Sequence, residues 1–258
     1  MKRNRIFPAL AGLAIFVCAF QVKLQAQTPL RVAAAADLEP VLPPIFEEFQ
    51  RSTAMRVDVT YKASAMLTTQ ILNGAPFDLF LSADMGYPKR LIAGGMAIEA
   101  APVLYARGTL VLWTRKDSRL PPPSLELLRN PALKRLAIAD PRRAPYGRAA
   151  VASLISLHLY GALKPRLAIA ENIAQAAQFV DSGNADAGLI SLTSALTPRL
   201  AADGRYFVIP RNLYPPIEQG AVVVKTSSQL AGARKLLSYL LSAPVQAQLA
   251  RSGLTPAH

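Results

Sequence analysis

Two polar side chains stand where a predicted strand is followed by a predicted helix, a position suited to binding a small anion. Residues 30–35 form an apolar run that predicts a buried strand, and Asp37 follows it as a good helix N-cap. Residues 57–61 alternate as a second strand, and Ser64 heads the next predicted helix. Helix N-terminal amides after such strands can bind an anion. Such a polar residue more often caps its helix without binding any ligand. The same strand-to-helix arrangement recurs at Ser64, however, and this repetition favours an anion site.

The stretch from residue 74 to residue 84, Gly-Ala-Pro-Phe-Asp-Leu-Phe-Leu-Ser-Ala-Asp, has the most specific pattern in the chain. Gly74 and Pro76 end the preceding segment, whose apolar residues have near-helical spacing. Residues 77–81, an apolar run interrupted by Asp78, predict a buried strand. The small and polar residues 82–84 after this strand could line a cleft.

This unit, a serine at a helix start followed by the turn and strand, resembles the periplasmic molybdate-binding proteins of molybdate ABC transporters. That family carries a Ser-rich turn and then GAP-x-DLFxSAD, and the similarity here runs from Leu30 to about Gly253. The resemblance implies an α/β fold of the type II periplasmic-binding-protein class, with two lobes, each a mostly parallel sheet flanked by helices. A generic strand-turn unit of another α/β protein is the alternative.

The resemblance also implies that the first lobe is discontinuous in sequence. Three prolines at 121–123 follow an apolar predicted strand at 108–114 and mark a candidate hinge. The apolar segment 220–225 is interpreted as the strand that returns to the first lobe. We therefore expect a signal peptide at 1–26, a first lobe of 27–115 and 217–258, and a second lobe of 116–216.

The family pattern assigns further binding positions in the middle of the chain. The sequence keeps Asp140-Pro141 and the helix entry Pro145-Tyr146-Gly147, which implies that the Tyr146 backbone amide points into the cleft. Ile173 resembles the family's second amide donor. Ser191 stands where many relatives have a tyrosine hydroxyl, and its shorter side chain makes a direct contact less secure. The expected substrate-binding residues are Asp37, Ser64, Tyr146, Ile173 and Ser191.

These donors suit molybdate, a tetrahedral dianion that accepts hydrogen bonds and donates none. Neutral amides and hydroxyls supply the hydrogen bonds, and each helix N-terminus adds about half a positive charge. Asp37 departs from the family, which usually has serine, threonine or asparagine near this point. A carboxylate about 4 Å from one anionic charge costs on the order of 4 kcal/mol at an effective dielectric near 20. We therefore predict that Asp37 turns outward as an N-cap and offers only its amide.

The first 26 residues predict an export signal and therefore a periplasmic protein. Lys2, Arg3 and Arg5 precede an apolar segment too short to span a bilayer comfortably, with cleavage expected near Ala26; a retained membrane anchor is the alternative. The single cysteine, Cys18, lies inside this signal, so the exported chain has neither disulfides nor cysteine–metal sites. The net charge of +13 is spread over scattered residues, which argues against a nucleic-acid surface.

No arrangement of catalytic residues is recognisable, so we expect a binding protein rather than an enzyme. The chain lacks the zinc-protease, nucleotide-binding and serine-hydrolase motifs. His158 shares a predicted helical face with Leu154 and Ile155, which favours a packed histidine over a ligand. The predicted function is capture of molybdate, and of tungstate, for an inner-membrane ABC permease, by a monomer without cofactor or direct metal ligands. Another oxyanion such as sulfate, or a sensor or enzyme on the same fold, is the alternative.

Overall fold

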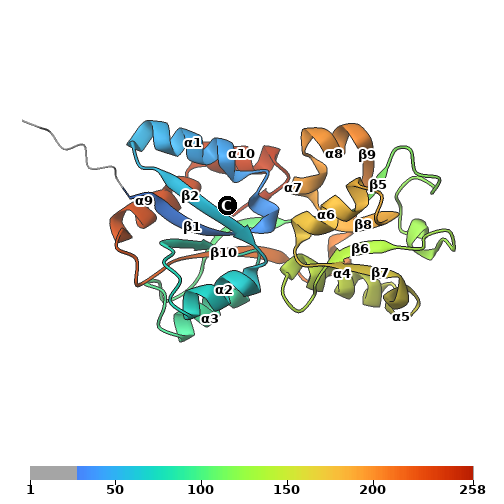
Figure 1. Cartoon of the computed structure of the whole chain (residues 1–258), viewed down its shortest axis with the longest axis horizontal. Helices are drawn as coiled ribbons and strands as arrows, with labels where there is room; N and C mark the ends of the chain where they lie inside the picture. The colour runs from blue at the N-terminus through green and yellow to red at the C-terminus, as the bar shows by residue number, and fades with distance from the viewer. Residues whose placement is uncertain (1–27, 258) are drawn as a thin grey trace, which may run out of the picture.

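The computed structural model describes residues 28–257, which form two lobes along the long axis of the molecule (Figure 1). Each lobe contains one β-sheet with helices on its faces, and the sheets have six and five strands. The predicted two-lobed α/β fold is therefore confirmed. The predicted signal peptide, residues 1–26, lies outside the described residues.

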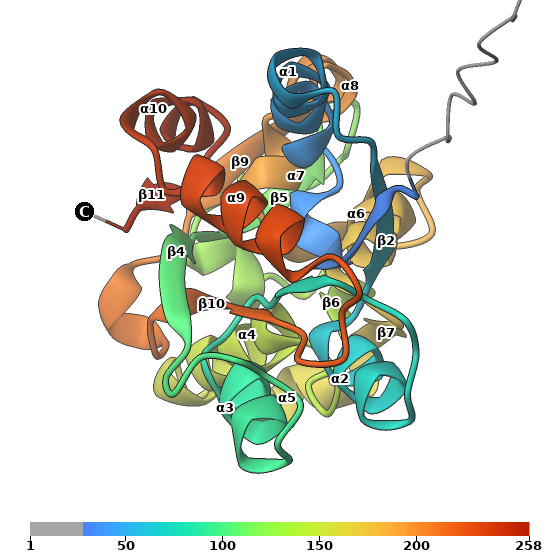
Figure 2. The same cartoon turned by 90° about the vertical axis from the view of Figure 1, so that its left-hand side faces the viewer.

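The first lobe contains the six-stranded sheet. In spatial order its strands are β11 (Thr255–Pro256), β4 (Val103–Gly108), β10 (Ile217–Val223), β3 (Leu79–Leu81), β1 (Leu30–Ala35) and β2 (Val57–Lys62). Its helices are the 3-10 helix η1 (Ala36–Leu38), α1 (Leu42–Thr53), α2 (Ser64–Leu72), α3 (Gly86–Ala93), α9 (Leu230–Leu240) and α10 (Ala243–Arg251). Helices α1, α9 and α10 lie on one side of the sheet, and α2 and α3 lie on the other (Figure 2).

Side-chain alternation along β1 explains this layering. Val32 and Ala34 point into a core that includes Phe49 of α1 and Leu236 of α9. Ala33, between them, belongs to a second core that includes Leu67 of α2. β1 is thereby buried on both faces at every position except Arg31, as expected for a nearly continuous apolar run.

The second lobe contains the five-stranded sheet. In spatial order its strands are β7 (Leu167–Ala170), β6 (Leu136–Ala139), β8 (Ala187–Ser191), β5 (Leu110–Arg115) and β9 (Gly204–Val208). Its α-helices are α4 (Pro145–Ser156), α5 (Tyr160–Leu163), α6 (Ile173–Asp181), α7 (Leu192–Ala195) and α8 (Pro198–Asp203). Three 3-10 helices lie in the connections between strands: η2 (Glu126–Arg129) between β5 and β6, η3 (Lys164–Arg166) before β7, and η4 (Arg211–Leu213) between β9 and β10.

Both sheets are mixed rather than mostly parallel. In the first lobe β1 pairs in parallel with β2 and β3, whereas β10 runs antiparallel to β3 and β4. In the second lobe β6 pairs in parallel with β7 and β8, whereas β5 runs antiparallel to β8 and β9. The antiparallel strands include those that carry the chain out of one lobe and back from the other.

The chain first passes between the sheets earlier than the expected boundary after residue 115. β4 ends at Gly108 in the first sheet, and β5 begins at Leu110 in the second, so the crossing is at Thr109. The chain returns between β9 and β10. The prolines at 121–123 follow β5 and lie within the second lobe. The apolar segment 110–115 therefore belongs to the second sheet. Strand pairing decides this, and the position of the prolines does not mark the boundary between the lobes.

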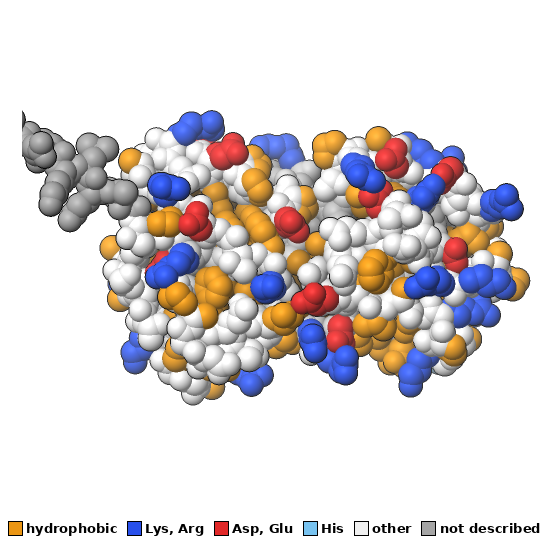
Figure 3. Space-filling view, in the orientation of Figure 1, with side chains coloured by type: hydrophobic (Ala, Val, Ile, Leu, Met, Phe, Trp, Pro, Cys, Tyr) orange, Lys and Arg blue, Asp and Glu red, His pale blue; other side chains and the backbone are white. Residues whose placement is uncertain are grey.

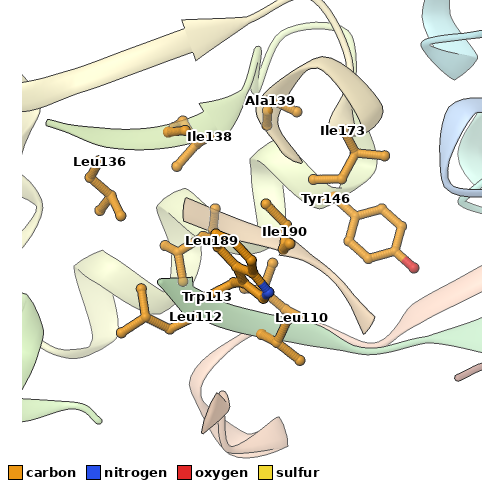
Figure 4. Close-up of a cluster of buried hydrophobic side chains, with 14 of the residues drawn as sticks. Leu110, Leu112, Trp113, Leu136, Ile138, Ala139, Tyr146, Ile173, Leu189 and Ile190 are labelled. Carbon is orange, nitrogen blue, oxygen red and sulfur yellow. The ribbon is translucent and has the colours of Figure 1, made fainter. Parts of the chain in front are cut away.

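The core of the second lobe extends to the interface with the first. Leu112 and Trp113 of β5 pack with residues of β6 and β8, and Tyr146 and Ile173 belong to the same cluster (Figure 4). Figure 4 shows the ring of Tyr146 at the margin of this cluster, with its hydroxyl oxygen pointing away from the other labelled side chains. Two residues predicted to bind a ligand through their amides are thus anchored by buried side chains.

The visible surface carries scattered charges. Figure 3 shows lysine and arginine side chains spread over both lobes and interspersed with acidic ones, without a continuous basic stripe on this face. Within residues 28–257, no helix has the length and hydrophobicity needed to span a membrane.

Candidate functional site

The segments that follow five strands meet at a small cavity between the lobes. β1, β2 and β3 lead into it from the first lobe, and β6 and β7 lead into it from the second. The cavity leaves about 10 Å³ for the centre of a water molecule, so the lobes are closed on each other. Its walls are Ala35, Ala36, Asp37, Lys62, Ala63, Ser64, Ala83, Ala144, Pro145, Tyr146, Asn172 and Ile173.

Three helices begin at this cavity. α2 starts at Ser64, α4 at Pro145 and α6 at Ile173. Within residues 28–257, the amides of Ser64, Tyr146 and Ile173 have no backbone hydrogen-bond acceptor, as expected for first-turn positions. Asn172 caps α6 by accepting from the Gln175 amide at 3.0 Å, which leaves the Ile173 amide free of the cap. Three positive helix ends therefore converge on one small space, an arrangement that favours an anion.

Ser64 adds a hydroxyl group to these amides. Its side chain is buried, and its Oγ accepts a hydrogen bond from the Ala83 backbone amide at 3.1 Å. With that acceptor position used, the hydroxyl proton is available to the cavity. The prediction that residues 82–84 lie at the cleft holds in this respect, because Ala83 both lines the cavity and orients Ser64.

Tyr146 contributes a second group that the sequence did not indicate. Its hydroxyl donates a hydrogen bond to Asp37 Oδ2 at 3.1 Å, which joins the second lobe to the first. Burial, together with the neighbouring Asp37, holds the pKa of Tyr146 well above its ordinary value, so the phenol keeps its proton. Tyr146 therefore has its amide at the start of α4 and its hydroxyl in the interface between lobes.

Asp37 does not turn outward, so that prediction is wrong. Its side chain is completely buried, and Oδ2 accepts from Gln219 Nε2 at 2.5 Å as well as from Tyr146. The next α-helix begins only at Leu42, and Asp37 lies within the short helix η1, so it has no helix end to cap. Burial raises the pKa of Asp37 to about 6, although the hydrogen bonds from Gln219 and Tyr146 act in the opposite direction.

Ser191 lies outside the cavity wall and serves as the N-cap of α7. Its Oγ accepts from the Ser194 amide at 3.2 Å and lies 2.8 Å from Ser194 Oγ. The neighbouring Thr193 hydroxyl instead reaches the first lobe, where it donates to the Asp37 backbone oxygen at 2.8 Å. Of the five predicted positions, four line the cavity together: Asp37, Ser64, Tyr146 and Ile173. Ser191 is not part of the cavity wall.

Sequence reasoning missed Lys62, Asn172 and Gln219. Lys62 ends β2 directly before the cavity, and its position after a strand was a usable signal. Asn172 was recognisable as a cap. Gln219 had no such signal, because it is placed beside Asp37 by the register of β10, where the pairing with β4 shifts between Gln219 and Gly220.

Contacts at the margin of the cavity hold the lobes together. The Ala65 amide on α2 donates to the Arg143 carbonyl oxygen at 3.2 Å. Arg148 on α4 pairs with Asp84 and donates to the Tyr87 hydroxyl at 3.2 Å, with its guanidinium 5.3 Å from the Tyr87 ring centre. Each contact joins one lobe to the other, and each must break for the lobes to separate.

A larger hollow lies elsewhere. A surface depression of about 580 Å³ on the first lobe is lined by Arg31, Asp58 and the turn at 73–77. It lies at the amino ends of β1 and β2, where no helix begins. The small cavity between the lobes is therefore the better candidate, because three helix N-termini converge on it.

The structure corrects the expected packing of His158. This residue follows the end of α4, is exposed, and has a left-handed backbone conformation with φ of 57°. The predicted helix ends at Ser156, before the histidine. Among residues 28–257, no group of three or more histidine, cysteine, aspartate or glutamate side chains is placed to hold a metal ion.

A model of the family described as bacterial extracellular solute-binding protein matches residues 30–255. This chain belongs to that family. The solute-binding protein is 35% identical over 237 residues to the molybdate-binding protein ModA of Azotobacter vinelandii, a match that covers 92% of this chain and 91% of the relative. It is 36% identical over 192 residues to the molybdate-binding protein ModA of Rhodobacter capsulatus, covering 74% of each chain.

A solved structure leads to the same comparison. The Azotobacter vinelandii periplasmic molybdate-binding protein superposes with a TM-score of 0.83 at 29% identity, covering 89% of this chain and 100% of that one. The resemblance seen in the sequence is thereby confirmed. Its relatives are solute-binding proteins, which agrees with the expectation that this chain is not an enzyme.

Proposed function

We propose that this solute-binding protein captures molybdate between its lobes and delivers it to an ABC permease. The observation that carries the proposal is the convergence of three helix N-termini and the Ser64 hydroxyl on one interlobe cavity. Two relatives at 35% and 36% identity are named molybdate-binding proteins, which favours molybdate among the oxyanions. We extend the proposal to tungstate, which has the same charge and tetrahedral shape.

The site offers donors where the anion needs them. Amides of Ser64, Tyr146 and Ile173 and the Ser64 hydroxyl are fixed by helices and strands before any ligand arrives. Hydrogen bonds to a charged group are worth about 1.5–3 kcal/mol each. Because sulfate has the same charge and shape, we propose that selectivity depends on the size of the closed cavity.

Lobe closure is the proposed functional motion. A tetrahedral oxyanion has five heavy atoms and needs more room than the present cavity gives, so we expect the lobes to stand slightly further apart in the complex. The ligand contacts both lobes only when they approach, so binding shifts the population towards closed forms. The permease would then recognise the closed protein. We further propose a periplasmic monomer, exported through residues 1–26, that needs no cofactor.

Thermal unfolding of residues 27–258 with molybdate, tungstate, sulfate and phosphate tests this proposal. A ligand at about a thousand times its dissociation constant stabilises by about 4.1 kcal/mol, which raises Tm by about 8–16 °C for a protein of this size. We expect this shift with molybdate and tungstate but not with sulfate. A shift with sulfate or phosphate instead would identify another oxyanion, and no shift with any of them would refute oxyanion binding.

Ser64→Ala is expected to weaken molybdate binding about tenfold, the lower end of the range for a hydrogen bond to a charged group. The variant loses the donor and leaves the buried Ala83 amide without its acceptor. Titration calorimetry measures the affinity. Ser52→Ala, which removes an exposed hydroxyl that bonds only within α1, is the control. Equal affinities of Ser64→Ala and wild type would remove this hydroxyl from the site.

Arg148→Ala is expected to release molybdate two to five times faster, because about 1 kcal/mol is the upper value for an exposed ion pair. The variant loses the contacts of Arg148 with Asp84 and Tyr87 across the lobe interface. Stopped-flow displacement measures the release rate. Arg142→Ala is the control, since Arg142 pairs with Asp140 inside the second lobe. The same acceleration in both variants would contradict a role of Arg148 in holding the lobes closed.

A further inference from the structure

Asp37 brings a buried acid to a site otherwise built of hydrogen-bond donors. Its Oδ2 accepts from both Tyr146 and Gln219, whereas its Oδ1 is buried and has no hydrogen-bond partner among residues 28–257. Gln219 Oε1, beside it, also has no partner within these residues. Buried acceptors in folded proteins are almost always satisfied. Two unsatisfied acceptors, one on Asp37 in the cavity wall and one on Gln219 behind it, therefore indicate that a hydrogen-bond donor is missing here.

A dianion in the cavity adds further acceptors and so increases the need for a hydrogen-bond donor. All oxygens of molybdate are acceptors, and Asp37 lines the cavity that the anion would occupy. Two acceptors that face each other repel unless a proton lies between them. We infer that Asp37 links anion binding to the uptake of one proton from solvent, and that this proton lies between Asp37 Oδ1 and an oxygen of the bound anion. The inference rests on the proposed function, because it requires an oxyanion in the cavity.

The ionisation of Asp37 supports a measurable effect near neutral pH. Its pKa is raised to about 6 by burial, so the carboxyl group of the free protein is mostly ionised above that pH. A bound dianion favours the protonated acid and raises the pKa further. Between the two pKa values the complex holds one proton more than the free protein, so affinity falls about tenfold per pH unit as pH rises.

Other ionisable groups around Asp37 do not account for such an effect. Burial raises the pKa of Tyr61, Tyr105 and Tyr146, so these phenols stay neutral. Asp84 is paired with Arg148, and Asp181, on α6, is paired with Arg199. The remaining charged side chains on the elements around Asp37 are Arg31, Glu39, Asp58, Lys62, Arg107 and Glu218; α7 has none. Among residues 28–257, the hydrogen-bond partners of the Asp37 side chain are Tyr146 and Gln219, and none of these charged groups is one of them.

Titration calorimetry with molybdate in two buffers of different ionisation enthalpy counts the protons directly. At about pH 7.5 we expect uptake of about one proton per anion by the wild-type protein, and an affinity that falls about tenfold per pH unit above about pH 6.5. For Asp37→Asn we expect no proton uptake and a constant affinity, tighter than wild type above neutral pH. Asp58→Asn, which removes an exposed carboxylate of β2, should behave as wild type.

The possible outcomes separate this inference from the proposed function. Molybdate binding by the wild type with no proton uptake would overturn the inference and leave the function intact. Proton uptake that persists in Asp37→Asn would assign the proton to another group and would equally overturn it. Absence of binding to molybdate, sulfate and phosphate at every pH would overturn both. The wild-type measurement is decisive even if Asp37→Asn does not fold.

Discussion

Ile173→Pro is expected to weaken molybdate binding by about 10- to 150-fold while leaving α6 in place, the effect of removing one charge-assisted hydrogen bond. Proline has no amide hydrogen, and Ile173 is the first residue of α6, the position at which proline fits a helix best. The preceding Asn172 has an extended backbone, with φ of −148° and ψ of 178°, which is compatible with a following proline. Titration calorimetry measures the affinity, and circular dichroism checks the helix.

The control for this substitution is Ile173→Ala. Alanine also removes most of the buried side chain, and a large-to-small change in a core costs about 2–5 kcal/mol of stability. It keeps the amide, however, so we expect affinity close to wild type. If alanine weakens binding as much as proline does, the side chain rather than the amide is responsible, and the proposed role of the α6 N-terminus is wrong.

Gly147→Ala is expected to lower stability by about 3 kcal/mol, which corresponds to about 6–12 °C in Tm, and to abolish tight binding. Gly147 directly follows Tyr146 in the first turn of α4, and a Cβ there would overlap the carbonyl oxygen of Ala139 at the end of β6. The atoms that this Cβ would overlap belong to the backbone of Ala139 and Asp140, so α4 must move away from β6. That movement displaces the amide and the hydroxyl of Tyr146 together. Thermal unfolding and titration calorimetry measure the two effects.

Gly161→Ala is the matched control, because a Cβ at Gly161 meets no atom within 4 Å. This substitution lies in a helix of the same lobe, so it tests the general cost of replacing glycine there. We expect unchanged binding and stability equal to wild type or higher by about 0.4–1 kcal/mol, as for a glycine whose conformation alanine can adopt. Stability of Gly147→Ala equal to that of this control would contradict the close approach of α4 to β6.

The sequence predicted those parts of the site that depend on local order along the chain. Ser64, Tyr146 and Ile173 each lie at a helix start, and helix starts can be recognised from neighbouring residues. The anchoring of Tyr146 and Ile173 in the second core follows from their apolar side chains. The family resemblance identified the two-lobed fold because the pattern at residues 74–84 is specific.

Features that depend on distant contacts could not be predicted. Asp37 was expected to cap a helix, but the partners that hold it inward, Tyr146 and Gln219, are 109 and 182 residues away. The lobe boundary was placed after the apolar segment at 110–115, whereas pairing of β5 with β8 and β9 puts that segment in the second sheet. An apolar strand can be buried equally well in either sheet, so its composition does not show to which sheet it belongs. His158 was misplaced because no glycine or proline directly after Ser156 marks the end of α4.

The position of molybdate in a crystal of the complex tests the central claim most directly. Anomalous scattering at the molybdenum absorption edge locates the metal atom without reference to the protein model. We predict one strong peak between the lobes, within hydrogen-bonding reach of its oxygens from the Ser64 hydroxyl and the amides of Tyr146 and Ile173. A peak on the surface of either lobe, or crystals that bind no molybdate, would contradict the proposal that these helix N-termini form an oxyanion site.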